Sequence, residues 1–310
     1  MAQLPTILVA LDGSKSSMDM VDYLIRMLAP RGVSIDLFHV KTEAPEALFD
    51  LGIDDSGVYV EEIGAWTRDM GTRIQAFMET ARSRFLEAGF APEAVTITLQ
   101  PRKIGIARDI IERANHGCAA LAVGRRGFGS LPEFMMGSIA AKLMETMARV
   151  PLAIVGGPPA GKRVLVAFDN SPCIRKGVDQ VVGMFDRKLA EILLCHIVRP
   201  LSIPHSVSRS FFSPGSEAHW LNENSRKIVP PLVAVKERLV NEGFNPEAFR
   251  TAILEKKISR AEAIMEQAGD PGLGTIIIGR HGLTSIPDFS MGRVARKVVQ
   301  MAYQKAVWIV

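Results

Sequence analysis

The sequence predicts an α/β fold made of two tandem doubly wound domains, each built on a parallel five-stranded sheet. Short apolar segments alternate with longer segments whose apolar residues recur at helical spacing, which is typical of a parallel sheet covered by helices on both faces. The pattern also occurs twice, because features of the first half recur about 155 residues later. The predicted domains are residues 1–156 and 162–310, joined by a linker at 157–161.

The first half predicts strands and helices in alternation. The predicted strands cover residues 6–12, 33–40, 94–99, 119–123 and 151–155. The predicted helices lie within residues 16–28, 66–85, 106–114 and 139–147. Residues 41–64 show little periodicity and are predicted to form a long loop.

The second half repeats this order. Residues 164–171 match residues 8–14, and His196 and Ile197 match His39 and Val40. Residues 200–225 are predicted to be the second long loop. The aromatic residues of this loop are Phe211, Phe212 and Trp220. They could form a partner surface or a lid, or could pack on their own domain.

The last strand of each half, at 152–155 and at 307–310, is expected at the edge of its sheet. Edge strands carry unpaired backbone groups, so they are natural places for pairing between the two domains. Pairing within the chain is expected first, and a homodimer of the whole chain could add to it.

The bulk composition suits a folded protein with two cores. The chain has 310 residues, of which 47% are hydrophobic and 23% charged. No apolar run reaches the roughly 18 residues needed to cross a bilayer, so no membrane association is expected. The N-terminus lacks a secretory pattern, and the cytoplasm is the expected location. The net charge of +4 is spread along the predicted helices, which argues against a nucleic acid partner.

Each half contains a glycine loop between a strand and a helix. Gly124 and Gly127 are followed, after nine residues, by Gly137 and Ser138 at a predicted helix start, and the loop at 279–292 repeats this spacing. The first N–H groups of a helix lack partners within it and carry the positive end of its dipole, while a missing Cβ lets an anion come close. An isolated glycine loop can be a tight turn, but the repetition favours a phosphate site.

Asp12 and Gly124 end two strands that are expected to be neighbours. In open α/β sheets the ligand crevice lies beyond the carboxyl ends of the strands, where the strand order switches direction. The two residues should therefore meet in one pocket although they are far apart in the sequence. Asp12 could instead cap the next helix, but its recurrence as Asp169 favours a site.

The strand ending in Asp12 and the later Gly-x2-Gly-x9-Gly-Ser pattern resemble the universal stress protein family, over essentially the whole chain and twice. The chain is similar to a tandem member, in which two domains form a pseudo-dimer. The resemblance implies strand order 3-2-1-4-5 in each domain and an adenine nucleotide alpha hydrolase-like fold. It also implies a stress-associated sensor or regulatory module that binds ATP and acts on a regulatory protein partner.

The resemblance further implies which residues hold the nucleotide, which could bring Mg²⁺ with it. In the first half these are Ala10, Asp12, Val40, Gly124, Arg125, Gly127, Gly137, Ser138 and Ile139. Asp12 and Val40 take the adenine positions, and Gly137 and Ser138 take the phosphate positions. Arg125 would line the wall, unless it is simply a solvated loop charge.

The equivalent residues of the second half are Asp169, Ile197, Gly279, Gly282, Gly292 and Arg293. Arg293 departs from the pattern because it stands where the first half has Ser138. A guanidinium cannot replace a compact hydroxyl in geometry, although it could pair with phosphate from further out. Nucleotide binding in the second half is therefore expected to be altered or lost, with retention left open by the other residues.

The sequence favours a binding module over an enzyme, and no catalytic or metal-ligating residue is predicted. Phosphoryl transfer usually needs metal ligands and cationic clamps, and no second carboxylate recurs in both loops, so any ATP hydrolysis should be slow. An adenylating enzyme would carry a Ser-Gly-Gly-x-Asp-Ser loop, which is absent. A nucleotide-free dimerisation scaffold remains the main alternative. His39 and His196 are expected in the core, as are the three cysteines.

Overall fold

The structure is a computed structural model of the 310-residue chain. It describes residues 4–42, 60–128, 132, 134–159, 161–188, 191–201, 213–255, 257–283 and 290–310. Phe211 and Phe212, two of the predicted loop aromatics, lie outside the described residues.

The first half alternates strands and helices as predicted. Its strands are β1 (Thr6–Ala10), β2 (Ser34–Lys41), β3 (Val95–Pro101), β4 (Ala120–Gly124) and β5 (Leu152–Val155). Its helices are α1 (Lys15–Met27), α3 (Val60–Glu87), α4 (Ile106–Asn115) and α5 (Ser138–Thr146), with a 3-10 turn η2 (Pro92–Ala94).

The second half repeats these elements in the same order. Its strands are β6 (Arg163–Ala167), β7 (Glu191–Ile197), β8 (Phe249–Leu254), β9 (Leu273–Ile278) and β10 (Ala306–Ile309). Its helices are α6 (Pro172–Val182), α7 (Pro214–Asn241), α8 (Arg260–Ala268) and α9 (Arg293–Met301), with a 3-10 turn η3 (Pro246–Ala248).

The predicted strand order 3-2-1-4-5 is present in each half, but the two predicted sheets are one. The ten strands run β3-β2-β1-β4-β5-β10-β9-β6-β7-β8. All neighbours are parallel except β5 and β10, which pair antiparallel at the centre with Trp308 opposite Ala153. Each half would otherwise expose a bare edge strand, so this pairing removes both edges and makes the halves one body.

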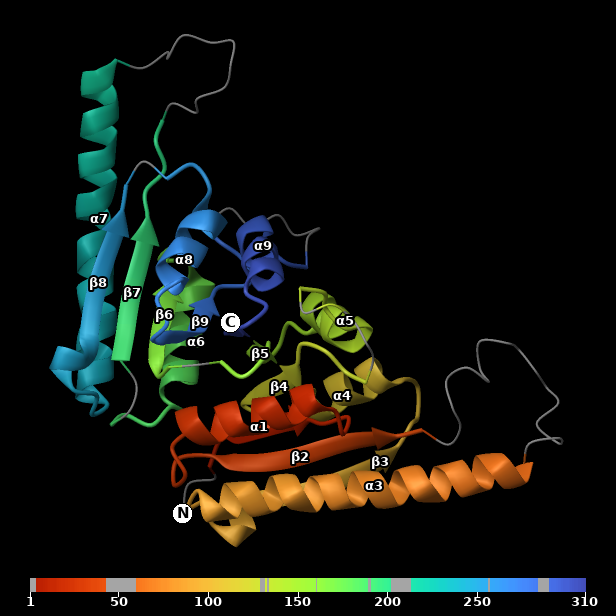
Figure 1. Cartoon of the computed structure of the whole chain (residues 1–310). Helices are drawn as coiled ribbons and strands as arrows, with labels where there is room; N and C mark the ends of the chain where they lie inside the picture. Colours follow the sequence, from red (N-terminus) through yellow and green to blue (C-terminus); the bar gives the residue numbers. More distant parts are fainter. Residues whose placement is uncertain are drawn as a thin grey trace, which may run out of the picture.

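Helices cover both faces of the continuous sheet, and α3 and α7 run along its outer strands at opposite ends (Figure 1). One face buries apolar side chains of α1, α3, α6 and α7 in a single cluster that spans both halves. The other face buries side chains of α4, α5, α8 and α9 in a second cluster. The two clusters give three layers around one sheet.

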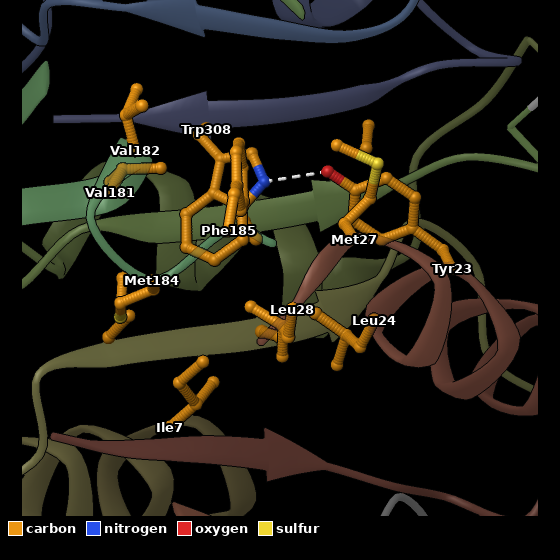
Figure 2. Packing of buried hydrophobic residues seen from close by; sticks show 14 of the residues in the cluster. Ile7, Tyr23, Leu24, Met27, Leu28, Val181, Val182, Met184, Phe185 and Trp308 are labelled. Atoms are coloured by element: carbon orange, nitrogen blue, oxygen red, sulfur yellow. Dashed lines mark hydrogen bonds between the residues drawn. The ribbon is translucent and has the colours of Figure 1, made fainter. Parts of the chain in front are cut away.

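The first cluster includes side chains of α1 packed against residues of the second half (Figure 2). Trp308 is fully buried and packs edge-on against Phe185, with ring centroids 5.6 Å apart. Its Nε1 donates to the Tyr23 hydroxyl at 2.9 Å, and that hydroxyl also lies 2.9 Å from Thr275 Oγ1. Burial raises the pKa of Tyr23 to about 12, so the phenol stays neutral and can serve both partners.

Both predicted long loops are shorter than expected. Helix α7 begins at Pro214, because Ser213 caps it and proline suits the first helical position. Helix α3 begins at Val60. Trp220 therefore lies on α7, where its Nε1 donates to Arg199 O at 3.1 Å, so it contacts its own half.

The connection from β5 to β6 uses glycines where the backbone requires them. Gly157 and Gly161 have φ of +60° and +86°, and a Cβ on Gly156 would overlap Tyr303 O. Within the described part of the chain, none of the helices is both long and apolar enough to cross a membrane.

Candidate functional site

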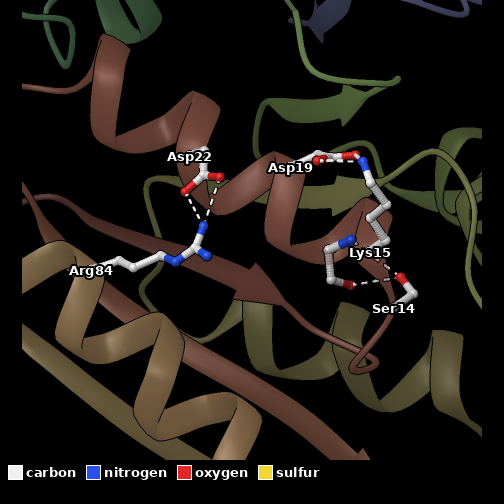
Figure 3. Close-up of polar contacts among 6 residues, drawn as sticks. Ser14, Lys15, Asp19, Asp22 and Arg84 are labelled. Atoms are coloured by element: carbon white, nitrogen blue, oxygen red, sulfur yellow. Dashed lines mark hydrogen bonds and ion pairs between the residues drawn. The ribbon is translucent and has the colours of Figure 1, made fainter.

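The turn after β1 holds Asp12 in place. Its Oδ1 accepts from Ser14 N at 2.9 Å and from Ser17 Oγ at 2.5 Å. Ser14 is also the N-cap of α1, and its side chain accepts from Ser17 N (Figure 3). Since Oδ1 is used by these donors, Oδ2 is the oxygen that faces the rest of the site.

Helix α1 is itself fixed to its neighbours. Arg84 of α3 donates to both carboxylate oxygens of Asp22, at 2.6 and 2.7 Å, and Lys15 pairs with Asp19 one turn further along α1 (Figure 3). These pairs are largely exposed, so each adds modestly to stability. The Arg84–Asp22 pair joins α1 to α3, whereas the Lys15–Asp19 pair lies within α1.

The glycine loop after β4 closes against the same turn. A Cβ on Gly127 would lie 2.6 Å from Asp12 Oδ2, so the two residues are in contact. Gly137 N donates to Arg125 O at 2.9 Å, which brings the end of the loop back to its beginning. A Cβ on Gly137 would lie 3.5 Å from Gly127 N. The structure thus brings together Asp12, Gly127 and Gly137, as the sequence predicted.

Helix α5 opens onto this loop with bare backbone donors. Gly137 is its N-cap and makes no side-chain hydrogen bond, and Ser138 is its first residue. The first N–H groups of a helix have no partner within it, so an anion with several oxygens fits here. A side chain at 127 would collide with Asp12 Oδ2, and one at 137 would begin beside Arg125 O and Gly127 N.

The apolar residues predicted for the walls lie on one face of the sheet. Ala10 and Val40 are buried in the second cluster, and Ile139 packs against it. The equivalent residues of the second half, Ala167 and Ile197, belong to the same cluster. These side chains offer an apolar surface beside each loop.

The Arg125 side chain neither lines the wall of the predicted nucleotide site nor lies in solvent, which corrects the prediction from the sequence. Its side chain is only 2% exposed, and the guanidinium donates to Val299 O at 2.6 Å and to Gln300 O at 3.0 Å in the second half. Arg280 is buried in the equivalent place. The signal that could have revealed this role is the arginine that follows the strand-end glycine in both halves.

The second half builds the same backbone with different side chains. Gly292 N donates to Arg280 O at 2.8 Å, and Gly292 is the uncapped N-cap of α9. A Cβ on Gly282 would lie 3.1 Å from Asp169 Oδ2. Gly279 directly follows the last residue of β9, and Arg293 is the first residue of α9.

Arginines lie near Asp169 at the second site. The pKa of the Arg260 guanidinium is lowered, first by burial and then by Arg199, while Asp169 opposes the shift. Arg260 is the first residue of α8, where α4 has Ile106. Arg293 is a further arginine, at the start of α9.

The two histidines are half-buried, so the prediction that they lie in the core is met only in part. His39 Nδ1 lies 2.7 Å from Leu11 O, and His196 Nδ1 lies 2.7 Å from Phe168 O. Burial lowers the pKa of both, although the carbonyl contact and the nearby aspartate oppose it. Each imidazole therefore ties its strand to the residue before Asp12 or Asp169.

The cysteines agree with the prediction only in part. Cys195 is buried, and burial raises the pKa of its thiol to about 11, whereas Cys118 and Cys173 are half-buried. No group of three or more His, Cys, Asp or Glu able to hold a metal ion occurs among the residues that the structure describes.

A separate cavity of about 280 Å³ lies at the opposite, amino edge of the second half. Arg163 and Asp270, two of its lining residues, pair with each other at 2.6 and 2.7 Å. Since these charges already match, and a Cβ on Gly272 would collide with the Arg163 guanidinium, this contact serves to hold the start of β6 against β9. The glycine loops at the carboxyl edge remain the better candidate.

Comparison with known proteins supports the repeat. The model of the universal stress protein family matches residues 4–156 and again residues 161–310. A Bacillus subtilis universal stress protein is 26% identical over 155 residues, which are 48% of this chain and 96% of that protein.

Solved structures share the two-domain fold. A universal stress protein from Archaeoglobus fulgidus aligns over 98% of this chain and 97% of its own, with a TM-score of 0.60 and 17% identity. A putative universal stress protein from Pseudomonas aeruginosa aligns over 99% of this chain and 93% of its own, with a TM-score of 0.55 and 14% identity. At these identities the likeness concerns the fold alone.

Proposed function

The chain belongs to the universal stress protein family, and from that premise we propose that its first half binds ATP or a related adenine nucleotide as a sensor or regulatory module in a stress response. The observation that carries the proposal is the contact of Asp12 with the glycine loop directly in front of an uncapped helix. A carboxylate beside free amides offers an acceptor and a set of donors within one hollow.

The donors suit a chain of phosphates. Gly137 N is used by Arg125 O, so the free amides are those of Ser138 and the next residues of the first turn. They act together with the positive end of the α5 dipole and with the Ser138 hydroxyl. Gly124 and Gly127 lack a Cβ, so β4 can pack closely on Ser16 of α1 and the loop can lie against Asp12 Oδ2.

The adenine end fits the other side of the hollow. Asp12 Oδ2 can accept from an exocyclic amine, and Ala10 and Val40 supply apolar surface for the ring. The pairing of Asp12 Oδ1 with Ser14 and Ser17 fixes the carboxylate before a ligand arrives. Preorganisation of this kind reduces the entropy lost on binding.

Catalysis is not part of the proposal. Any ATP turnover should be slow, because phosphoryl transfer requires placed metal ligands or cationic clamps as well as a phosphate cradle. Mg²⁺ would accompany the phosphates, with the Ser138 hydroxyl as the protein group nearest to them. The cytoplasm is the proposed location.

Mass spectrometry of nucleotide released from the denatured, purified full chain tests this proposal. An adenine nucleotide should be released, or should bind to the emptied protein in a calorimetric titration with ATP. A nucleotide-free scaffold is the second candidate, which the large interface between the halves favours. Absence of binding in both experiments would establish the scaffold instead.

A further inference from the structure

Two buried arginines occupy equivalent places in the halves. Arg125 follows Gly124 at the end of β4, and Arg280 follows Gly279 after β9. They are 2% and 6% exposed. Neither forms an ion pair with a carboxylate within the described ranges, and burial lowers the pKa of both guanidinium groups. A buried cation without a carboxylate is costly, so its neutral partners must be well placed.

Each guanidinium reaches across the interface to the last turn of a helix in the other half. Arg125 donates from Nη1 to Val299 O at 2.6 Å and from Nη2 to Gln300 O at 3.0 Å, both in α9. Arg280 donates from Nη1 to Met144 O of α5 at 2.8 Å. The last carbonyls of a helix lack partners within it and carry its negative end, which makes them natural acceptors for a cation.

Each guanidinium also holds its own glycine loop. Arg125 Nη2 donates to Phe134 O at 3.1 Å, and Arg280 Nη1 lies 3.3 Å from Ser290 O. These carbonyls come shortly before the helix N-caps, Gly137 and Gly292. One side chain therefore joins the loop of its own half to a helix of the other.

The helices that receive the arginines are those that open the two candidate sites. Helix α5 runs from Ser138 to Thr146 and α9 from Arg293 to Met301, so each spans roughly 13 Å at about 1.5 Å per residue. A short helix moves as a rigid unit, so a contact that fixes its last turn also restricts the motion of its first turn. The loop of one half is thereby linked to the cradle of the other, in both directions.

We infer that Arg125 and Arg280 are positioning residues that couple the two glycine loops, so that ordering one loop with a ligand stabilises the helix N-terminus in the other half. The nucleotide part of this inference rests on the proposed function. The loop that binds first fixes its arginine, the arginine fixes the far helix, and the second site is then already ordered. By linkage, the coupling acts equally in both directions.

A matched control is present at the same interface. Arg296 of α9 donates to Glu145 Oε1 of α5 at 2.9 Å, so it also bridges the two helices. Both side chains are exposed, at 40% and 55%, and neither forms a hydrogen bond with the described residues of either glycine loop. Arg296→Met therefore removes a bridge across the interface without touching the proposed link.

Two measurements on the full chain test the coupling. Arg280→Met should weaken ATP binding in the first half by about fivefold or more, although Arg280 belongs to the second half. Without nucleotide, the same variant should raise hydrogen exchange in α5 as well as in its own loop. Arg296→Met should leave both unchanged. If the methionine variant does not fold, Arg125→Lys tests the link from the other side, because Arg125 uses both Nη1 and Nη2 and lysine lacks this planar fork; it should raise hydrogen exchange in α9.

The outcomes separate the two proposals. If Arg280→Met raises hydrogen exchange in α5 but the natural chain binds no nucleotide, the proposed function is rejected and the coupling is kept. Changes confined to the loop at 279–292, with unchanged α5 exchange and unchanged ATP affinity in the first half, would reject the coupling.

Discussion

The two halves build the same backbone cradle but put different side chains around it. In both, an aspartate faces a loop glycine and an uncapped helix begins at the loop's end. The first helical residue is Ser138 in the first half and Arg293 in the second. The fold thus maintains the cradle through glycines and hydrogen bonds, while the side chains around it differ between the halves.

The turns after β1 and β6 differ in the same way. Ser17 donates to Asp12 in the first half, whereas Ile174 takes the equivalent place in the second. Asp169 Oδ1 accepts from Ser171 N at 3.0 Å. The extra hydroxyl makes the Asp12 carboxylate the more firmly held of the two. We therefore expect the first half to be the better prepared for a ligand.

The largest expected effect comes from filling the cradle. Gly137→Phe should weaken ATP binding by about 100-fold or more, because the new ring occupies the approach to the free amides. The backbone should tolerate a side chain, since a Cβ would lie 3.4 Å from Arg125 O. Calorimetric titration of each variant measures the effect.

The matched variant is Gly292→Phe, and Gly137→Ala controls for folding. Because the first half is expected to hold the tighter ATP site, Gly292→Phe should lower the affinity of that site for ATP far less than Gly137→Phe does. Equal losses in the two variants would mean that the halves bind alike.

Exchanging the first helical residue should move binding between the halves. Arg293→Ser gives the second half the compact hydroxyl of the first, and should raise its affinity for ATP by about tenfold. Ser138→Arg should lower the affinity of the first half by a similar factor. In Arg293→Ser, the gain should appear in the titration as a second ATP site per chain. Unchanged affinity in both variants would show that residues 138 and 293 do not cause the difference between the halves.

The contrast between α1 and α6 should appear in stability. Tyr23→Phe removes the hydroxyl that bonds Trp308 and Thr275, so it should lower the free energy of unfolding by about 1–3 kcal/mol. The equivalent residue of α6 is the exposed Gln180, which donates to Ala119 O at 2.8 Å. Gln180→Ala should cost under about 1 kcal/mol. Denaturant unfolding compares them, and similar losses would contradict the unequal packing.

The smallest expected effect is a pH dependence. The folded pKa of His39 and of His196 is lowered, so their contribution to stability is present above the ordinary histidine pKa and is lost as the pH falls through the folded value. Thermal unfolding between about pH 7 and 5 should therefore be less acid-sensitive in His39→Gln and His196→Gln than in the natural chain. Unchanged profiles would show that both histidines titrate normally.

Local patterns in the sequence were enough for much of the fold and for the backbone of the candidate site. Strand alternation and the repeated glycine spacing depend on neighbouring residues, so β1, β4 and their pairing, which brings the strand ends at Asp12 and Gly124 together, could be predicted. The role of Arg125 could not, because it depends on the antiparallel pairing of β5 with β10, which brings α9 within reach. Helix α7 begins inside the predicted loop at 200–225, because Ser213 caps it and Pro214 suits its first position.

The most direct test of the account follows individual backbone amides of the full chain by nuclear magnetic resonance while ATP is added. The amide signals of Ser138 and Ile139 should shift first and most, with smaller or later changes at Arg293. Shifts centred on Arg163 and Asp270 at the opposite edge, or no shift at the start of α5, would contradict the account.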